Sequence, residues 1–141
     1  MKKVLFLFVI VLCISSCKKK GFSPEGPTDI RIKNLSDQTF TNVIVNTTNI
    51  EGQELNFGSI PPGDYSEYFR FDKAYNKAEI TVTINSSDPS INGVYTTGTV
   101  DNTYQAYLTP VKATYVVWIN STSEKKIEIF KVILESDLTD Y

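Results

Sequence analysis

Short segments in which apolar and polar residues alternate are the feature that most restricts how this 141-residue chain can fold. The clearest of them is Ile80–Ile84, in which Ile80, Val82 and Ile84 alternate with two threonines. Successive side chains of a β-strand point to opposite sides, so this pattern predicts a strand with one buried side and one side facing water. After residue 17, no long segment has the 3.6-residue period of an amphipathic helix.

Similar runs of β-branched and aromatic residues recur along the chain, at intervals of roughly ten residues, and they predict about eight or nine short strands. Turn residues separate them, most clearly at Pro61-Pro62-Gly63 and in the segment Asp88–Gly93. We therefore expect residues 29–141 to form one all-β domain, an antiparallel β-sandwich of immunoglobulin-like or transthyretin-like type. The Cys…Trp…Cys pattern of true immunoglobulin domains is absent, which leaves the topology open.

The N-terminal segment differs from the rest of the chain. Lys2 and Lys3 precede an unbroken apolar run, Val4–Leu12, which Cys13 and Ile14 extend. A helix that spans a bilayer needs about 20 apolar residues, so this run is too short to be one. It fits the apolar region of a secretory signal peptide, which has about 7 to 15 residues.

The tetrad Ile14-Ser15-Ser16-Cys17 follows this run and resembles the lipobox of bacterial lipoproteins. The resemblance implies cleavage before Cys17, acylation of the Cys17 sulfur, and a membrane anchor of two or three acyl chains, which holds firmly. Residues 1–16 are then a cleaved signal, and residues 17–28 are a lipidated, flexible tether. The alternative is an ordinary signal peptide that leaves Cys17 as a free thiol.

The whole layout resembles small outer-envelope lipoproteins of the Bacteroidetes type, whose function is unknown. The resemblance lies in the lipobox, the lysine-rich tether, a Pro/Gly linker and an all-β domain that contains the segment Ser59–Asn85. It implies attachment to the outer membrane, because Lys18 stands where an inner-membrane lipoprotein carries Asp. No acidic export signal follows Cys17, and this favours the periplasmic side over the cell surface.

Composition argues against most catalytic chemistry. The chain contains no histidine, which removes the commonest general base and metal ligand, and its two cysteines are Cys13 and Cys17. Neither a phosphate-binding glycine loop nor a nucleophile elbow is present. The net charge of −2 becomes more negative once the N-terminal lysines are set aside, so nucleic acid is a poor partner. We expect no enzyme, no cofactor and no nucleic-acid binding.

The last two strands predict a candidate interface. Apolar residues occupy both sides of the segments Thr114–Ile119 and Ile127–Leu134, whereas a strand of a sandwich has one solvated side. Either a loop covers one side, or the side is a surface for a partner. The second alternative predicts an exposed patch around Trp118, Phe130 and Val132.

Tyrosines provide a second candidate, because aromatic rings stack on sugars. Tyr65, Tyr68 and Tyr107 are the residues that we would expect in a glycan platform, although sandwiches also use Tyr in the core and at sheet edges. Acidic residues in the predicted turns do not match the spacing of a calcium loop, so we expect no metal site.

These observations predict a lipid-anchored lipoprotein of the cell envelope that acts as a non-catalytic binding or assembly module. The membrane is its first partner, through the anchor on Cys17, and a protein or a glycan is the second. The alternative function is that of a glycan-binding accessory lipoprotein in polysaccharide uptake or adhesion.

Overall fold

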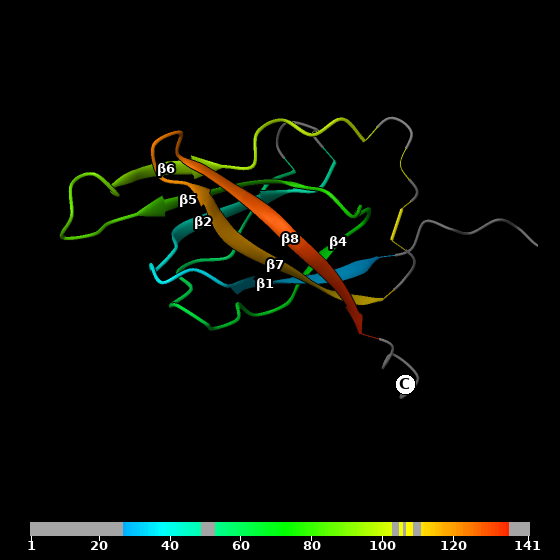
Figure 1. Ribbon diagram of the computed structural model, residues 1–141. Coiled ribbons are helices and arrows are strands. Elements are labelled where there is room, and N and C mark those ends of the chain that lie inside the picture. The colour runs from blue at the N-terminus through cyan, green and yellow to red at the C-terminus, as the bar shows by residue number, and fades with distance from the viewer. Residues whose placement is uncertain (1–26, 49–52, 103–104, 106, 109–110, 136–141) are drawn as a thin grey trace, which may run out of the picture.

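The computed structural model describes residues 27–48, 53–102, 105, 107–108 and 111–135, and all regular structure within these ranges is β (Figure 1). The prediction of an all-β domain is confirmed. The signal peptide, residues 1–16, and most of the tether lie outside the described residues. The run Tyr104–Thr109 also predicts a strand, but residues 104, 106 and 109 lie outside the described residues, and residues 105 and 107–108 are not in a strand. The strands are β1 Thr28–Asn34, β2 Thr41–Asn46, β3 Leu55–Asn56, β4 Phe69–Phe71, β5 Glu79–Ile84, β6 Gly93–Thr96, β7 Lys112–Ser121 and β8 Lys126–Glu135.

The eight strands form one sheet in the order β3-β2-β5-β6-β8-β7-β1-β4. Most neighbours are antiparallel, but β1 pairs with β7 in parallel, and so does β6 with β8. The sheet is therefore mixed, and the expectation of a purely antiparallel fold is wrong at these two pairs. The physical reason is that β1 and β7 lie far apart in the sequence, and alternation within each strand carries no information about the direction of its neighbour.

The sheet folds over one core, so that its two halves face each other. One half contains β3, β2, β5 and β6, and the other contains β8, β7, β1 and β4; Figure 1 shows β7 and β8 crossing in front of β2 and β5. The halves are joined in the sheet by one pair of residues, Thr96 and Lys126. Their inner sides share a single cluster of buried side chains, which holds them together.

Alternation along the strands explains the core. Ile80, Val82 and Ile84 are all buried, as the sequence pattern predicts, and the threonines between them lie on the outer side of β5. The same alternation in β1 buries Ile30 and Ile32. Burying one aliphatic side chain of this size stabilises a fold by about 1.5–3 kcal/mol, so a shared core of such residues dominates the stability.

Asn34, at the end of β1, connects two of the places where the chain passes from one half to the other, the β1–β2 and β3–β4 connections. Its side-chain amide donates to the carbonyls of Gln38 and Ile60, at 2.7 and 3.0 Å, although the residue is fully buried. Its backbone carbonyl accepts from the Gly63 N–H at 2.9 Å. The Gly63 φ of 78° requires the freedom of glycine, so the predicted Pro-Pro-Gly turn is confirmed and docks on β1.

A β-bulge interrupts the pairing of β7 with β8. Val116 pairs with Lys131, but Val117 pairs with Ile129, so Phe130 has no partner on β7. The extra residue shifts the alternation of β8 by one position. Val132 therefore lies opposite the buried Tyr115, and Ile133 lies opposite Thr114.

Candidate functional site

Exposed aromatic and apolar side chains gather on the outer side of the half-sheet that contains β1, β7 and β8. The exposed fraction is 57% for Phe130, 47% for Leu35, 45% for Tyr65 and 37% for Trp118. Basic side chains lie among them. We call this surface the aromatic face and define it by the residues Leu35, Tyr65, Trp118, Phe130 and Ile133 together with Arg31, Lys33, Lys112 and Lys131.

Strand register places these residues on one side of the sheet. Arg31 pairs with Thr114, and Lys33 pairs with Val116. The ladder continues beyond β1, because the Leu35 N–H donates to the Val117 carbonyl at 2.8 Å, which sets Leu35 beside Trp118. On β8, Lys131 pairs with Val116 and Ile133 pairs with Thr114. Both therefore lie on the same outer side as Arg31 and Lys33.

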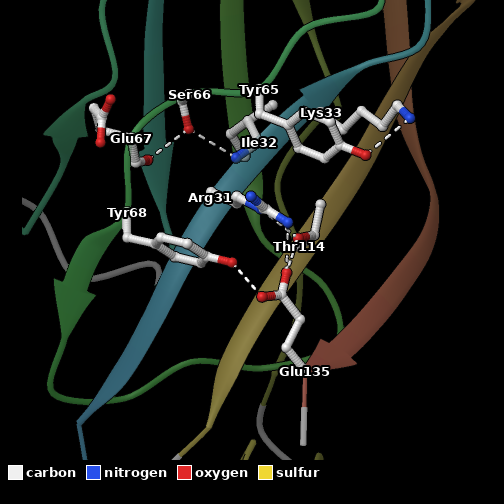
Figure 2. Close-up of polar contacts among 9 residues, drawn as sticks. All are labelled: Arg31, Ile32, Lys33, Tyr65, Ser66, Glu67, Tyr68, Thr114 and Glu135. Carbon is white, nitrogen blue, oxygen red and sulfur yellow. Dashed lines mark hydrogen bonds and ion pairs between the residues drawn. The ribbon is translucent and has the colours of Figure 1, made fainter. Parts of the chain in front are cut away.

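A network around Arg31 occupies one end of the aromatic face (Figure 2). The guanidinium carbon lies 4.3 Å from the centre of the Tyr65 ring and 4.9 Å from that of Tyr68, so Arg31 stands between two rings. It donates to Glu135 at 2.8 Å and to the Thr114 hydroxyl at 2.9 Å. Glu135 also accepts hydrogen bonds from Thr114 and from the Tyr68 hydroxyl. Both carboxylate oxygens of Glu135 thus accept hydrogen bonds from within the protein.

The network changes the protonation of its members. Burial alone would raise the pKa of the Glu135 carboxyl, but hydrogen bonds from Tyr68 and Thr114 and the charge of Arg31 lower that pKa below its ordinary value. Burial and the adjacent Glu135 carboxylate raise the pKa of Tyr68 to about 12. At neutral pH Glu135 is therefore an anion, and Tyr68 is a neutral hydrogen-bond donor. This arrangement stabilises the ion pair of Glu135 with Arg31; it is not one that transfers protons.

Trp118 and Phe130 form the other end of the aromatic face. Their ring centres are 5.8 Å apart with the planes tilted by 60°. The Trp118 indole N–H donates to Glu128 at 2.7 Å, and the same carboxylate accepts from the Asn120 amide at 3.0 Å. The bulge exposes Phe130, because a residue without a partner on β7 is free to lean outward. This contact brings together two of the three residues of the predicted interface.

Val132, the third residue of that interface, does not lie on the aromatic face. It is partly buried, packs against the core, and lines a depression of about 470 Å³ between β8 and the segments 76–78 and 97–100. Ala78, Val100 and Ile129 share the lining. The expected patch of three residues is thus reduced to Trp118 and Phe130, because the bulge turns Val132 inward.

The three tyrosines of the predicted glycan platform are also divided. Tyr65 and Tyr68 flank Arg31, whereas Tyr107 packs against Tyr75 with ring centres 4.9 Å apart. The Lys73 ammonium lies 5.1 Å from the centre of the Tyr107 ring. No ring contact joins Tyr107 to the other two among the described residues, so the three do not make one row.

The outer side of the opposite half-sheet has a different character. Outward positions of β2, β5 and β6 in the described chain carry no aromatic and no basic residue. They are Thr41, Ile44, Asn46, Glu79, Thr81, Thr83, Val94 and Thr96. This side is that of an ordinary solvated sheet, so the two outer sides of the domain are chemically unequal.

Sequence reasoning missed Arg31, Lys33, Leu35 and Glu135 as members of the site. The signal that could have found Arg31 and Lys33 is their position in β1, where they alternate with buried isoleucines and so must point outward together. Their proximity to Glu135, more than 100 positions away, depends on the parallel pairing of β1 with β7.

The remaining predicted site residues belong to the N-terminal segment. Cys17 and the cleavage-site residues Ile14, Ser15 and Ser16 are outside the described residues. Asp88 accepts from Ser90 within its own turn. Within the described ranges, no three His, Cys, Asp or Glu side chains are grouped as metal ligands would be. The described part of the chain likewise has no helix with the length and apolar character needed to cross a membrane.

Comparison with known proteins shows no family for this chain. No family model matches the chain, and no curated protein matches it. It is similar to an NMR structure of a protein from Eubacterium rectale, with a TM-score of 0.47 and 16% sequence identity, over 79% of this chain and 94% of that one.

Proposed function

We propose that this protein is a lipid-anchored lipoprotein of the cell envelope that acts as a non-catalytic binding or assembly module. The aromatic face is the observation that carries the proposal. It exposes Trp118, Phe130, Leu35 and Tyr65 on one side of a small domain, while the outward positions of β2, β5 and β6 carry no aromatic residue. Exposed apolar groups gathered in this way on a soluble domain mark an interaction site.

The N-terminal sequence supports the anchored part of the proposal. An apolar run of signal-peptide length ends in Ile14-Ser15-Ser16-Cys17, and the first strand begins at Thr28. Acyl chains on Cys17 hold the domain at the membrane, here the outer membrane with its periplasmic side favoured. Confinement raises the local concentration of the domain, so even a weak binding face is effective there.

Chemistry supports the non-catalytic part. The sequence has no histidine, and the acid in the most elaborate polar network, Glu135, is committed to Arg31, Thr114 and Tyr68. A catalytic carboxylate needs an unused oxygen that faces a substrate.

We also propose that the fold is a β-sandwich of the immunoglobulin-like or transthyretin-like type, with two parallel pairings as a local departure. Two half-sheets enclose one core and share one pair of residues, Thr96 and Lys126, in the sheet. This arrangement supports a sandwich whose layers are joined along one seam.

Site-specific photo-crosslinking in intact cells tests the binding function. A photoreactive residue at position 130 is expected to form adducts with a protein or with lipid, while one at Thr83 on the opposite outer side forms none. Cys17→Ser, expected to release the protein from the membrane fraction, tests the anchor in parallel. No adduct at position 130 would refute the binding function, and retention of the Cys17→Ser protein would refute the anchor.

A glycan-binding role is the second candidate, favoured by the exposed Tyr65 ring beside Arg31 and Lys33. The Lys33 ammonium donates to the Tyr65 hydroxyl at 3.0 Å, so a ring and hydrogen-bonding groups adjoin at the surface. Binding on a glycan array that Tyr65→Ala abolishes would favour this role. An array without signal would discard it.

A further inference from the structure

Part of the aromatic face has the composition of a surface that rests on lipid headgroups. Trp118 combines a large apolar ring with an N–H that is already satisfied by Glu128 at 2.7 Å, and Phe130 beside it exposes 57% of its surface. Tryptophan rings concentrate at the interface of a bilayer, where their apolar part contacts the acyl chains and their polar group stays near water. Lysines among them extend their ammonium groups from an apolar stem.

Charge on the aromatic face is effectively positive. Two of its acidic neighbours are neutralised: Glu135 is paired with Arg31 at 2.8 Å, and Asp29 is paired with Arg70 at 2.8 Å. A third, Glu128, accepts from the neutral donors Trp118 and Asn120 and keeps its negative charge. By contrast, Lys33, Lys112 and Lys131 form no ion pair within the described residues. Three such lysines against the one carboxylate of Glu128 leave this side with a surplus of positive charge, whereas the chain as a whole carries a net charge of −2. Such an asymmetry orients a protein with this side toward an anionic surface.

The tether is long enough for the domain to lie flat on that surface. Residues 18–28, fully extended, span about 36 Å between Cys17 and the start of β1. The seven residues of β1 extend over about 23 Å, which is shorter than the reach of the tether. A lipid on Cys17 therefore leaves the outer side of β1, β7 and β8 free to meet the same membrane.

We propose that the aromatic face docks on the surface of the membrane that holds the anchor, with Trp118 and Phe130 among the headgroups and the lysines against anionic lipid. This inference rests on the proposed function, because it takes the Cys17 anchor as given. It assigns anionic lipid as the binding partner of the module. It also implies that the outer side of β2 and β5 faces away from the membrane.

Trp118 provides the test, because it is the only tryptophan in the chain. The full lipidated protein is reconstituted into vesicles made of equal parts phosphatidylcholine and phosphatidylglycerol. We expect a blue shift of Trp118 emission, loss of quenching by iodide, and strong quenching by lipids brominated near the headgroup. The matched control carries Trp118→Phe with Thr81→Trp, which moves the indole to the opposite outer side; its emission should stay accessible to iodide.

The lysines are tested by the triple variant Lys33→Gln, Lys112→Gln and Lys131→Gln. We expect it to float with the vesicles but to lose the blue shift, whereas the corresponding arginine variant retains it. Circular dichroism confirms that each variant is folded.

The outcomes separate the inference from the proposed function. If wild-type protein floats with vesicles but Trp118 stays accessible to iodide, the docking proposal is wrong and the anchor stands. If the protein does not float at all, the anchor fails and the inference falls with it. Protection of Trp118 only in native envelope fragments, and not on lipid vesicles, would identify a protein partner and overturn the proposal.

Discussion

Among single residues, Glu135 has the most consequential position. It closes the last strand, accepts from Arg31, Thr114 and Tyr68, and holds together three elements that are remote in sequence. Its partners are partly screened by water, since the side chains of Arg31 and Glu135 are 28% and 29% exposed. The network therefore contributes modestly to stability but orders the end of the aromatic face.

We expect Glu135→Gln to lower the free energy of unfolding by about 1–2 kcal/mol at pH 7, because an amide accepts weaker hydrogen bonds than a carboxylate. The lowered pKa of Glu135 means that its contribution is present above the ordinary value of 4.5 and is lost as the pH falls through the lowered value. Urea unfolding of both proteins from pH 7 to pH 3 should show the difference shrinking below about pH 4.5.

The control for this prediction is Glu124→Gln, which removes an exposed ion pair with Lys126 and should leave stability unchanged. A difference between wild type and Glu135→Gln that stays constant with pH would show that the carboxylate charge is not what stabilises the network.

At the scale of elements, the bulge at Phe130 is the feature that links fold and site. Without it, regular alternation would place Phe130, Val132 and Leu134 on one side of β8, as the sequence suggests. With it, Val132 turns toward the core while Phe130 and Ile133 stay on the aromatic face. One additional residue thus decides which apolar side chains are available to a partner.

The bulge predicts that two adjacent positions of β8, 132 and 133, differ in how well they tolerate a charged side chain. Val132→Asp should lower the free energy of unfolding by about 2–4 kcal/mol, because it places a charge against the core. Ile133→Asp should lower it by less than about 1 kcal/mol, because this side chain lies on the outer side. Chemical denaturation of the two variants measures both values. The reverse order would show that β8 alternates without a bulge.

At the scale of the whole molecule, two half-sheets depend on one core. In the sheet they share one residue pair, Thr96 and Lys126, yet the inner side chains of both belong to one buried cluster. Neither half can cover its apolar side alone. The parallel pairing of β1 with β7 also joins two strands that are far apart in the sequence. Because such long-range contacts form late, they favour slow folding.

We therefore expect the domain to unfold as one cooperative unit. Native-state hydrogen exchange should give the central amides of β1, β2, β5 and β7 one common, highest protection, while the edge strands β3 and β4 exchange faster. Two separate levels of protection, one for each half-sheet, would contradict a shared core and indicate that the seam between β6 and β8 opens independently.

The sequence by itself determined the all-β class, because alternation, β-branched residues and turn residues act over a few positions. It also indicated the buried side of β5 and the turn at Gly63, whose conformations depend on neighbours in the chain. It marked Trp118 and Phe130 as unusual, since an apolar outer side is visible in a strand pattern.

Tertiary structure decided the rest. The parallel pairings, the single seam and the meeting of Arg31 with Glu135 join residues that are far apart in the sequence, and no local pattern encodes such distances. The inward turn of Val132 depends on a register shift against β7, which a single strand cannot reveal. The separation of Tyr107 from Tyr65 and Tyr68 has the same origin: local alternation sets the side of a strand, whereas only the packing of strands sets which sides meet.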